Sequence, residues 1–151
     1  MDKFTKAELE GRTIWNTTLS GRIEDIKFTE SKYDPVDGYL TGQTGTEVVF
    51  ELKKRDINSK DYEKEGYIIE KIKYDALMTE YKRSNHIPYY VNIFKDCIKM
   101  WDIRELKPSF ETKYCTATTA ENYKKGGKPK LVHLIKTEPT STIWINNTLY
   151  N

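Results

Sequence analysis

The feature that most constrains the fold is the stretch YDPVDGYLTGQTGTEVVFELKKRD, which spans residues 33–56. It reads as two strands, expected over 37–41 and 46–55, that flank a short turn. A three-residue loop over 43–45, in which Gly45 supplies a positive φ, is a common hairpin connection. The stretch therefore predicts an antiparallel strand pair, and the loop length determines which residues face each other.

The three-residue loop places Asp37 directly opposite Glu51. Because a strand repeats its face every second residue, Lys53 points to the same side as Glu51. A two-residue turn would shift the register by one and place Asp37 among apolar residues, which is costly without a partner. The first register is the more favourable one. It sends a set of apolar side chains to the other face, namely Leu40, Val48, Phe50 and Leu52.

Two carboxylates that face each other across a strand pair repel, so one takes up a proton or the sheet loses stability. A divalent cation removes this conflict, because Mg²⁺ favours one or two carboxylates together with waters and phosphate oxygens. Lys53 would then lie beside the ion and stabilise a phosphoryl transition state or orient the attacking water. The implied chemistry is metal-assisted cleavage of a phosphodiester. Taken singly, Glu51 and Lys53 are also typical of a solvated strand face, and Asp37 opposite them shifts the balance.

Length and charge limit the alternatives. A chain of 151 residues is long enough for one domain with a hydrophobic core. The 25 basic and 23 acidic residues give a net charge of only +2, so any nucleic-acid contact must come from a local patch. No apolar run is long enough to predict a transmembrane helix, and the first residues, MDKFTKAELEGR, do not resemble a signal peptide. A cytoplasmic protein of a bacterial or phage-infected cell is expected.

The rest of the chain predicts a mixture of helices and strands. The expected elements are a helix over 6–19, a strand over 22–28, a charged loop over 57–66, a helix over 67–84, and strands over 89–94 and 98–103. The last third is less regular: 114–130 reads as a loop or short helix, 131–136 as a short buried strand and 141–151 as an edge strand. This order predicts a single domain of the α/β (α+β) class, with a mixed sheet flanked by helices.

Asp37, followed by Glu51-Leu52-Lys53 on a hairpin, resembles the motif of the PD-(D/E)xK nuclease superfamily. The hairpin comes after a helix and a strand and before a second helix, as in that superfamily. One residue separates Pro35 from Asp37, which departs from a contiguous PD pair. The resemblance implies a restriction-endonuclease-like core, in the order αβββαβ, over about residues 5–95, with 96–151 as a C-terminal extension.

The resemblance also implies roles for individual residues. Asp37 and Glu51 would hold Mg²⁺, which Mn²⁺ could replace, and Lys53 would assist the attacking water. Many members carry a further glutamate of the metal shell on the first helix. Glu10 is the candidate here because it lies on the Ala7–Ile14 side of that helix. An ordinary helix-surface acid is the alternative interpretation of Glu10.

Several branches of the superfamily have a polar residue and a tyrosine four apart on the second helix. Glu70 and Tyr74 match this spacing, with Glu where Gln is more usual. Lysines nearby and in the last third are candidate DNA contacts, namely Lys71, Lys73, Lys124, Lys125 and Lys128. A solvated helix face and a soluble loop are their ordinary alternatives.

The function that the resemblance implies is a metal-dependent endonuclease, a deoxyribonuclease that hydrolyses DNA phosphodiester bonds. DNA would be its partner, and a homodimer is expected because one small domain covers little DNA. The alternative is a catalytically inactive protein of the same fold that binds DNA or serves as a structural or interaction partner.

Overall fold

The structure is a computed structural model that describes residues 3–31, 33–63, 66–115 and 128–145. Its elements in chain order are α1 (Lys3–Leu19), β1 (Ile23–Phe28), β2 (Gly38–Gly42), β3 (Glu47–Lys54), α2 (Ser59–Glu63), β4 (Tyr67–Glu70), α3 (Lys71–Ser84), β5 (Ile87–Ile93), β6 (Cys97–Asp102), the 3-10 helix η1 (Ile103–Glu105), β7 (Glu111–Cys115), β8 (Lys128–Ile135) and β9 (Ser141–Trp144). In the part of the chain that is described, no helix has the length and apolar character needed to cross a membrane.

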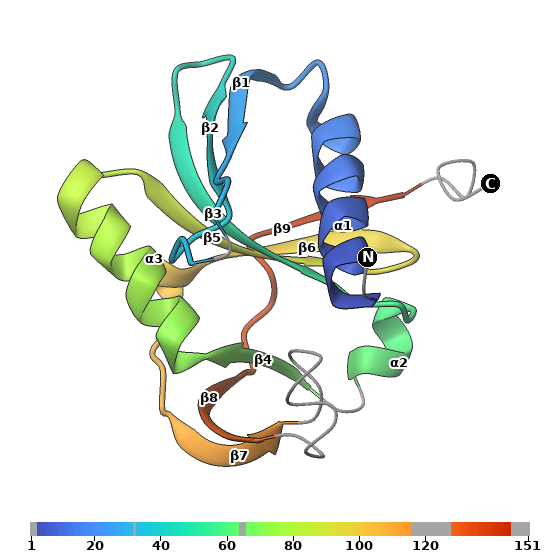
Figure 1. Ribbon diagram of the computed structural model, residues 1–151, viewed down its shortest axis with the longest axis vertical. Helices are drawn as coiled ribbons and strands as arrows, with labels where there is room; N and C mark the ends of the chain where they lie inside the picture. The colour runs from blue at the N-terminus through green and yellow to red at the C-terminus, as the bar shows by residue number, and fades with distance from the viewer. Residues whose placement is uncertain (1–2, 32, 64–65, 116–127, 146–151) are drawn as a thin grey trace.

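The strands form two sheets (Figure 1). The main sheet has six strands in the order β1-β2-β3-β5-β6-β9, and the second has three in the order β4-β8-β7. Within the main sheet β3 and β5 are parallel, whereas the other neighbours are antiparallel. The crossover from β3 to β5 runs through α2, β4 and α3. The predicted α/β class, with a mixed sheet flanked by helices, is thereby confirmed. The predicted order αβββαβ corresponds to α1, β1, β2, β3, α3 and β5, with α2 and β4 inserted before α3.

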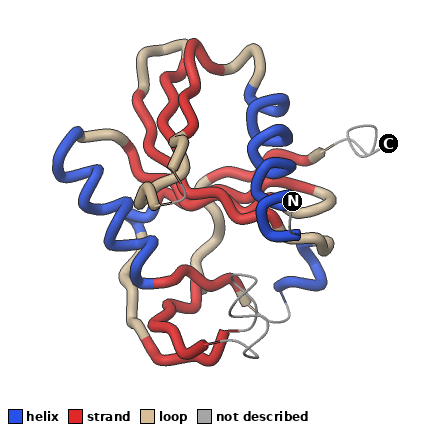
Figure 2. The backbone as a smooth tube through the Cα atoms, viewed as in Figure 1, coloured by secondary structure: helices blue, strands red, loops and turns tan. Residues whose placement is uncertain are grey.

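Each face of the main sheet is covered by its own hydrophobic core. Figure 2 shows the helices on either side of the sheet. On one face Trp15 and Leu19 of α1 pack around Phe50 of β3. On the other face Leu77 of α3 and Ile69 of β4 belong to a second cluster, which the three-stranded sheet helps to cover. Alternate residues of β3 therefore enter different environments, as the period of a strand requires.

The hairpin has the predicted register. Tyr39 pairs with Val49, and Gly45 has a φ of 86° in the three-residue loop. β2 begins at Gly38, one residue later than expected, and Asp37 precedes it. A side chain at position 38 is excluded, because a Cβ there would lie 2.5 Å from the Lys27 carbonyl oxygen and 2.6 Å from Phe50 Cζ. The glycine after Asp37 thus lets the β1-β2-β3 meander close tightly.

The helix expected over 67–84 is wrong in its first turn, since Tyr67–Glu70 forms strand β4. This segment pairs with β8 over Glu70↔Val132 to Tyr67↔Ile135, a long-range contact that overrides the helical spacing of the apolar residues. The exposure of Ile72, at 73%, shows that the spacing had included a residue outside the core.

Two further segments differ from the sequence expectation. The charged loop over 57–66 contains the short helix α2, which ends before Gly66 at a φ of 83°. Residues Glu111–Cys115, partly expected as loop or helix, form β7 because they pair with β8. For β7 the tertiary partner decides the local structure.

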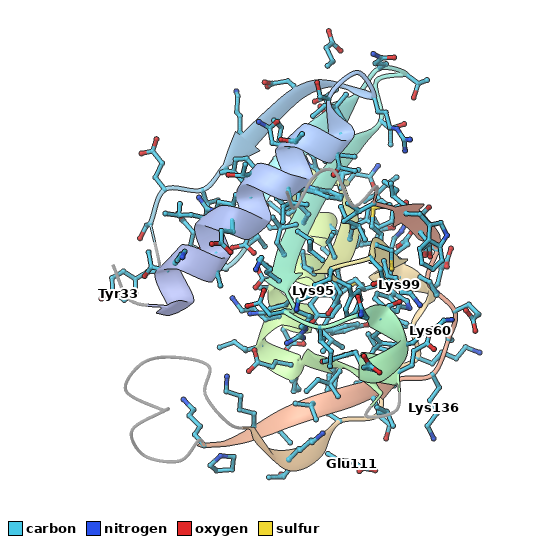
Figure 3. The ribbon with its side chains drawn as sticks, turned by 90° about the vertical axis from the view of Figure 1, so that its right-hand side faces the viewer. Tyr33, Lys60, Lys95, Lys99, Glu111 and Lys136 are labelled. Carbon is cyan, nitrogen blue, oxygen red and sulfur yellow. The ribbon has the colours of Figure 1, made fainter. Side chains whose placement is uncertain are left out.

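The chain after residue 95 contributes to both sheets. β6 and β9 extend the main sheet, and β7 and β8 build most of the second. Trp101 of β6 is 1% exposed, and its indole N–H donates to the Thr137 carbonyl oxygen at 3.1 Å. Figure 3 shows the second sheet at one end of the molecule, with Glu111 on β7 and Lys136 just beyond β8.

Candidate active site

Asp37 is held at the start of β2 by both its backbone and its side chain. Its N–H donates to the Phe50 carbonyl oxygen at 3.0 Å, and its own carbonyl oxygen accepts from the Thr29 N–H at 2.9 Å. Its Oδ2 accepts the Leu52 N–H at 2.7 Å. The carboxylate takes an amide that a regular ladder would give to a backbone carbonyl, so the acidic group is fixed beside Glu51.

Glu51 is a buried acidic residue. It lies in the middle of β3, between β2 and β5, and its side chain is only 2% exposed. Burial is the main reason that its pKa rises to about 7; nearby Asp37 also raises it, while Lys53 and Lys73 oppose the rise. An ionisable acid buried in the centre of a sheet is costly, which marks it as a candidate functional group.

Two lysines share one oxygen of Glu51. Lys73 Nζ of α3 lies 3.0 Å from Oε1, and Lys53 Nζ of β3 lies 3.6 Å from the same atom. Both lysine side chains are partly exposed, at 28% and 32%. The other oxygen, Oε2, is buried and has no hydrogen-bond partner among the described residues. A buried acceptor without a donor is rare in proteins, and it is the kind of atom that binds a cation or an ordered water.

Glu70 extends the cluster to the second sheet. It is the last residue of β4, it precedes α3, and it forms an ion pair with Lys130 of β8. Burial alone would raise the pKa of Glu70, but Lys130, Lys53 and Lys73 outweigh this effect and the net pKa is lowered. The sequence pattern placed Glu70 on the second helix. In the structure it is the last residue of strand β4 and lies near the lysines.

Behind Glu51 lies a network on β5 that the sequence analysis had not identified. Glu51 pairs with Tyr90 in the parallel register, and Lys53 pairs with Asn92. Arg55 bridges this network: its Nε donates to Asn92 Oδ1 at 3.1 Å, and its Nη2 donates to Tyr90 Oη at 3.3 Å. Recognising that β3 and β5 run parallel would have placed these side chains beside the motif, since neighbours on parallel strands share a face.

Asp37 and Glu51 fit a hard divalent cation. Their oxygens are the donors that Mg²⁺ prefers, and Glu51 Oε2 is a buried acceptor still without a partner among the residues described. Over the same residues, no three His, Cys, Asp or Glu side chains gather closely enough to hold a metal by themselves. An ion held by two carboxylates would complete its shell with water or phosphate oxygens, as Mg²⁺ commonly does.

Glu10 is not brought to this cluster. It lies on α1, the helix that covers the opposite face of the main sheet, and its carboxylate is 3.0 Å from Lys54 Nζ and 3.9 Å from Lys6 Nζ. Lys54 follows Lys53 on β3 and therefore points to the other face. The role of Glu10 in a metal shell stays a prediction.

The five candidate DNA-binding lysines have different surroundings. Lys71 pairs with Asp75 at 2.5 Å on the exposed side of α3, whereas Lys73 reaches Glu51. Lys128 is exposed at the start of β8. Lys124 and Lys125 lie outside the described residues.

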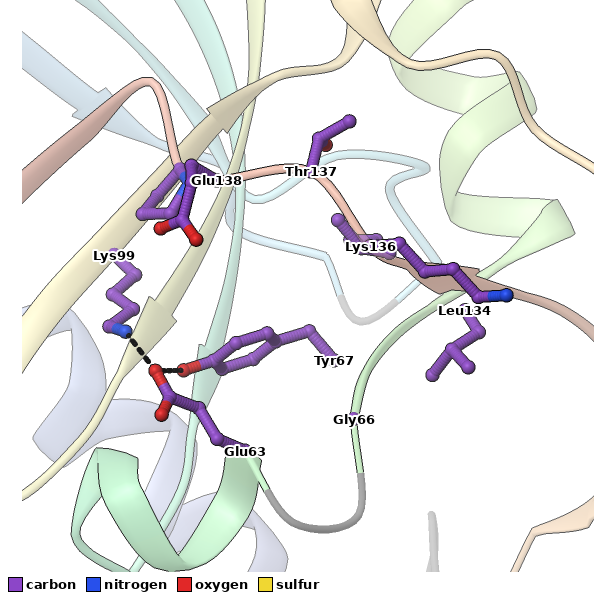
Figure 4. A pocket seen from close by; sticks show the side chains of 10 residues that line it. Glu63, Gly66, Tyr67, Lys99, Leu134, Lys136, Thr137 and Glu138 are labelled. Carbon is purple, nitrogen blue, oxygen red and sulfur yellow. Dashed lines mark hydrogen bonds and ion pairs between the residues drawn. The ribbon is translucent and has the colours of Figure 1, made fainter.

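A second carboxylate–lysine cluster lies elsewhere in the molecule, in the wall of a cavity of ≈380 Å³ (Figure 4). Here Glu63 Oε1 is 2.9 Å from Lys99 Nζ and accepts the Tyr67 hydroxyl at 3.1 Å. These hydrogen bonds with Lys99 and Tyr67 lower the pKa of Glu63. Every member of this cluster has a partner, so its role is explained by stability alone.

No protein-family model matches the chain, and no curated protein matches its sequence. Among solved structures, the chain is similar to Hjc of Archaeoglobus fulgidus, a Holliday junction resolvase from an archaeal hyperthermophile. The TM-score is 0.49 at 12% sequence identity, and the match covers 65% of this chain and 80% of that chain. The likeness concerns the backbone arrangement alone.

Proposed function

We propose that this protein is a metal-dependent nuclease that hydrolyses DNA phosphodiester bonds. The observation that carries the proposal is Glu51, a carboxylate 2% exposed at the centre of the main sheet, with the Asp37 carboxylate nearby and Lys53 on the same face. A buried carboxylate next to a second one is costly to a fold that gains nothing from it. Metal-assisted hydrolysis gives both carboxylates a role.

Asp37 and Glu51 are the residues that would hold the Mg²⁺ or Mn²⁺ ion. When bound, such an ion neutralises charge on a phosphate and activates a water for attack. The Leu52 N–H keeps the Asp37 carboxylate in one orientation, and β2 and β5 on either side of β3 fix the backbone of Glu51. Ligands held this rigidly need little reorganisation during the reaction.

Lys53 is the residue placed to act on the substrate. Its side chain is 32% exposed, so its ammonium can reach both solvent and the Glu51 carboxylate. From this position it donates to a non-bridging phosphate oxygen and orients the attacking water, which stabilises the negative charge that develops in the transition state.

The strand pair β7-β8 supplies a basic track toward this site. Lys113 of β7 pairs with Lys130 of β8, and Lys128 lies two residues before Lys130 on the same face. Lys130 also reaches Glu70, which is itself within the electrostatic range of Lys53. A phosphate backbone that follows these lysines would lead to Glu51.

The ion pairs of Glu51 favour a second candidate, a protein of the same fold that binds DNA without cutting it. Lys73 and Lys53 already neutralise the carboxylate, as in a structural ion-pair cluster. In that case nucleic-acid binding would not depend on a metal.

A cleavage assay separates the two candidates. The substrates are supercoiled plasmid, linear duplex, single strand and a four-way junction, each with Mg²⁺ or Mn²⁺. Cleavage is expected to stop with EDTA, in Asp37→Asn and in Lys53→Ala, and to persist in Glu63→Gln, a carboxylate variant of the second cluster. DNA binding without cleavage on any substrate would support the inactive protein instead.

A homodimer is part of the proposal. Light scattering during gel filtration, with and without the duplex, measures the mass of the free protein and of its complex. A monomer in both states would remove the dimer from the proposal and leave the chemistry of the site unchanged.

A further inference from the structure

The two oxygens of Glu51 are in different situations. Oε1 is 3.0 Å from Lys73 Nζ and 3.6 Å from Lys53 Nζ, while Oε2 has no hydrogen-bond partner among the described residues. The Glu51 side chain is 2% exposed, and both ammonium groups that contact it belong to side chains that are partly exposed. A cation that binds Glu51 therefore lies close to Lys73, and the two positive charges oppose each other.

Lys73 is also placed where a phosphate could meet it. It lies on α3, its side chain is 28% exposed, and it acts electrostatically on both Glu51 and Glu70. The carboxylates of Asp37, Glu51 and Glu70 offset most of the positive charge of the basic groups around them, namely Lys53, Lys73, Lys130 and Arg55. A cluster whose charges are largely offset attracts a phosphate backbone weakly, and an added divalent cation makes it more positive.

We propose that Lys73 and the divalent cation compete for Glu51, and that the cation releases Lys73 to bind a phosphate group of the nucleic acid. This inference rests on the proposed function for the class of ligand, a DNA phosphate. It makes metal binding and DNA binding mutually reinforcing, since a coupling between two sites is reciprocal. Lys73 is then a gating and phosphate-binding residue rather than a metal ligand.

The competition predicts opposite effects of one substitution. In Lys73→Met the cation no longer meets a competing ammonium, so Mn²⁺ alone is expected to bind several-fold more tightly than to the wild type. In the same variant the gain in DNA affinity that the metal gives, about 10-fold in the wild type for a coupling of typical size, is expected to shrink. Replacing a purely structural lysine would not raise the Mn²⁺ affinity and at the same time reduce the gain in DNA affinity that the metal gives.

The first measurement is Mn²⁺ binding by calorimetry without nucleic acid, on the wild type, Lys73→Met and Lys73→Arg. The arginine variant keeps the positive charge and is expected to return the Mn²⁺ affinity toward the wild-type value. Lys82→Met is the matched control, because Lys82 lies in the last turn of the same helix and is exposed. Circular dichroism and thermal melting check that every variant folds.

The second measurement is the anisotropy of a fluorescein-labelled DNA duplex in EDTA or Ca²⁺, with the same variants and a gel that detects any cleavage. Unchanged or weaker Mn²⁺ binding in Lys73→Met would overturn the inference, as would an unchanged metal-dependent gain in DNA affinity. Both results are compatible with an active nuclease. Failure of the proposed function looks different, since then the wild type cleaves no substrate with either metal, whatever its affinity for DNA.

Discussion

The carboxylate–lysine cluster around Glu51 and the one around Lys99 are built in opposite ways. Around Glu51 the anion is buried, at 2% exposure, and its lysines are partly open to solvent. Around Lys99 the cation is buried, at 10% exposure, while Glu63 is 51% exposed. Both contain a short ion pair, yet the pKa of the carboxyl group is raised to about 7 in the first and lowered in the second.

The difference shows what burial of each partner does. A half-exposed carboxylate such as Glu63 keeps its hydration, and its bonds to Lys99 and Tyr67 add to it. A buried carboxylate such as Glu51 loses its hydration, and its ion pairs with Lys53 and Lys73 do not compensate fully for the lost hydration energy. The first arrangement serves stability. The second leaves a buried carboxylate that a further cation could neutralise, as a metal-dependent catalytic site requires.

The largest expected difference between the two clusters is in the rate of DNA cleavage. Glu51→Gln is expected to lower the rate of DNA cleavage by more than about 100-fold, the upper end of the losses seen when groups around a metal ligand are removed. Glu63→Gln is expected to leave the rate unchanged. Single-turnover cleavage of the preferred substrate measures both. Equal rates for the two variants would contradict the assignment of Glu51.

The next prediction concerns stability and pH. Between 4.5 and about 7 the folded Glu51 keeps a proton that the unfolded chain has lost, so the free energy of unfolding falls as pH rises through this window. The shift corresponds to about 3 kcal/mol. Glu51→Gln is therefore expected to gain about this much relative to the wild type between about pH 4 and pH 8, in EDTA. The contribution of Glu63 to the free energy of unfolding has the opposite pH dependence, because a lowered pKa gives stability that is lost as pH falls. Urea unfolding at several pH values measures both, and a Glu51→Gln difference independent of pH would be inconsistent with the buried acid.

A smaller effect is expected at the buried lysine of the second cluster. Lys99→Met removes the ammonium that lies over the Tyr67 ring and pairs with Glu63, while Glu63 remains exposed to solvent, so the loss of unfolding free energy should be about 1 kcal/mol. Lys136→Met, on the rim of the same cavity, is the matched control and should be neutral. Thermal and urea unfolding provide the values. A loss of cleavage in Lys99→Met would show that this cavity takes part in function.

The smallest effect tests whether DNA reaches one cluster and not the other. Lys130→Ala, beside Glu70, is expected to weaken duplex binding a few-fold and to reduce the salt dependence by about one unit of slope. Lys136→Ala, a few residues further along the chain, should change neither quantity. Binding curves over a range of salt concentrations measure both slopes. Equal slopes for the two variants would place the DNA elsewhere.

The local part of the site was predictable from the sequence. The loop over 43–45 set the register of the hairpin, and the register placed Asp37 opposite Glu51 with Lys53 on the same side. These features depend on neighbours in sequence and on the period of a strand, which a sequence displays directly.

The features of the site that the sequence analysis missed depend on contacts between segments that are far apart in the sequence. Strand β4 forms because β8 lies beside it, and Tyr90 joins the site because β5 runs parallel to β3. The contact of Lys73 with Glu51 needs the position of α3 relative to the sheet, which the helical pattern alone does not give. The depth at which Glu51 is buried was not foreseen either, since strand periodicity assigns a face but not what covers it.

The position of β6 has a consequence for the production of this protein. β5 is buried over four consecutive residues, 90–93, and β6 covers one of its two edges. A fragment trimmed at residue 95, before β6, leaves that hydrophobic edge open to pair with other chains. During synthesis the same edge stays unprotected until β6 has left the ribosome, so premature termination should yield aggregates rather than a smaller folded protein.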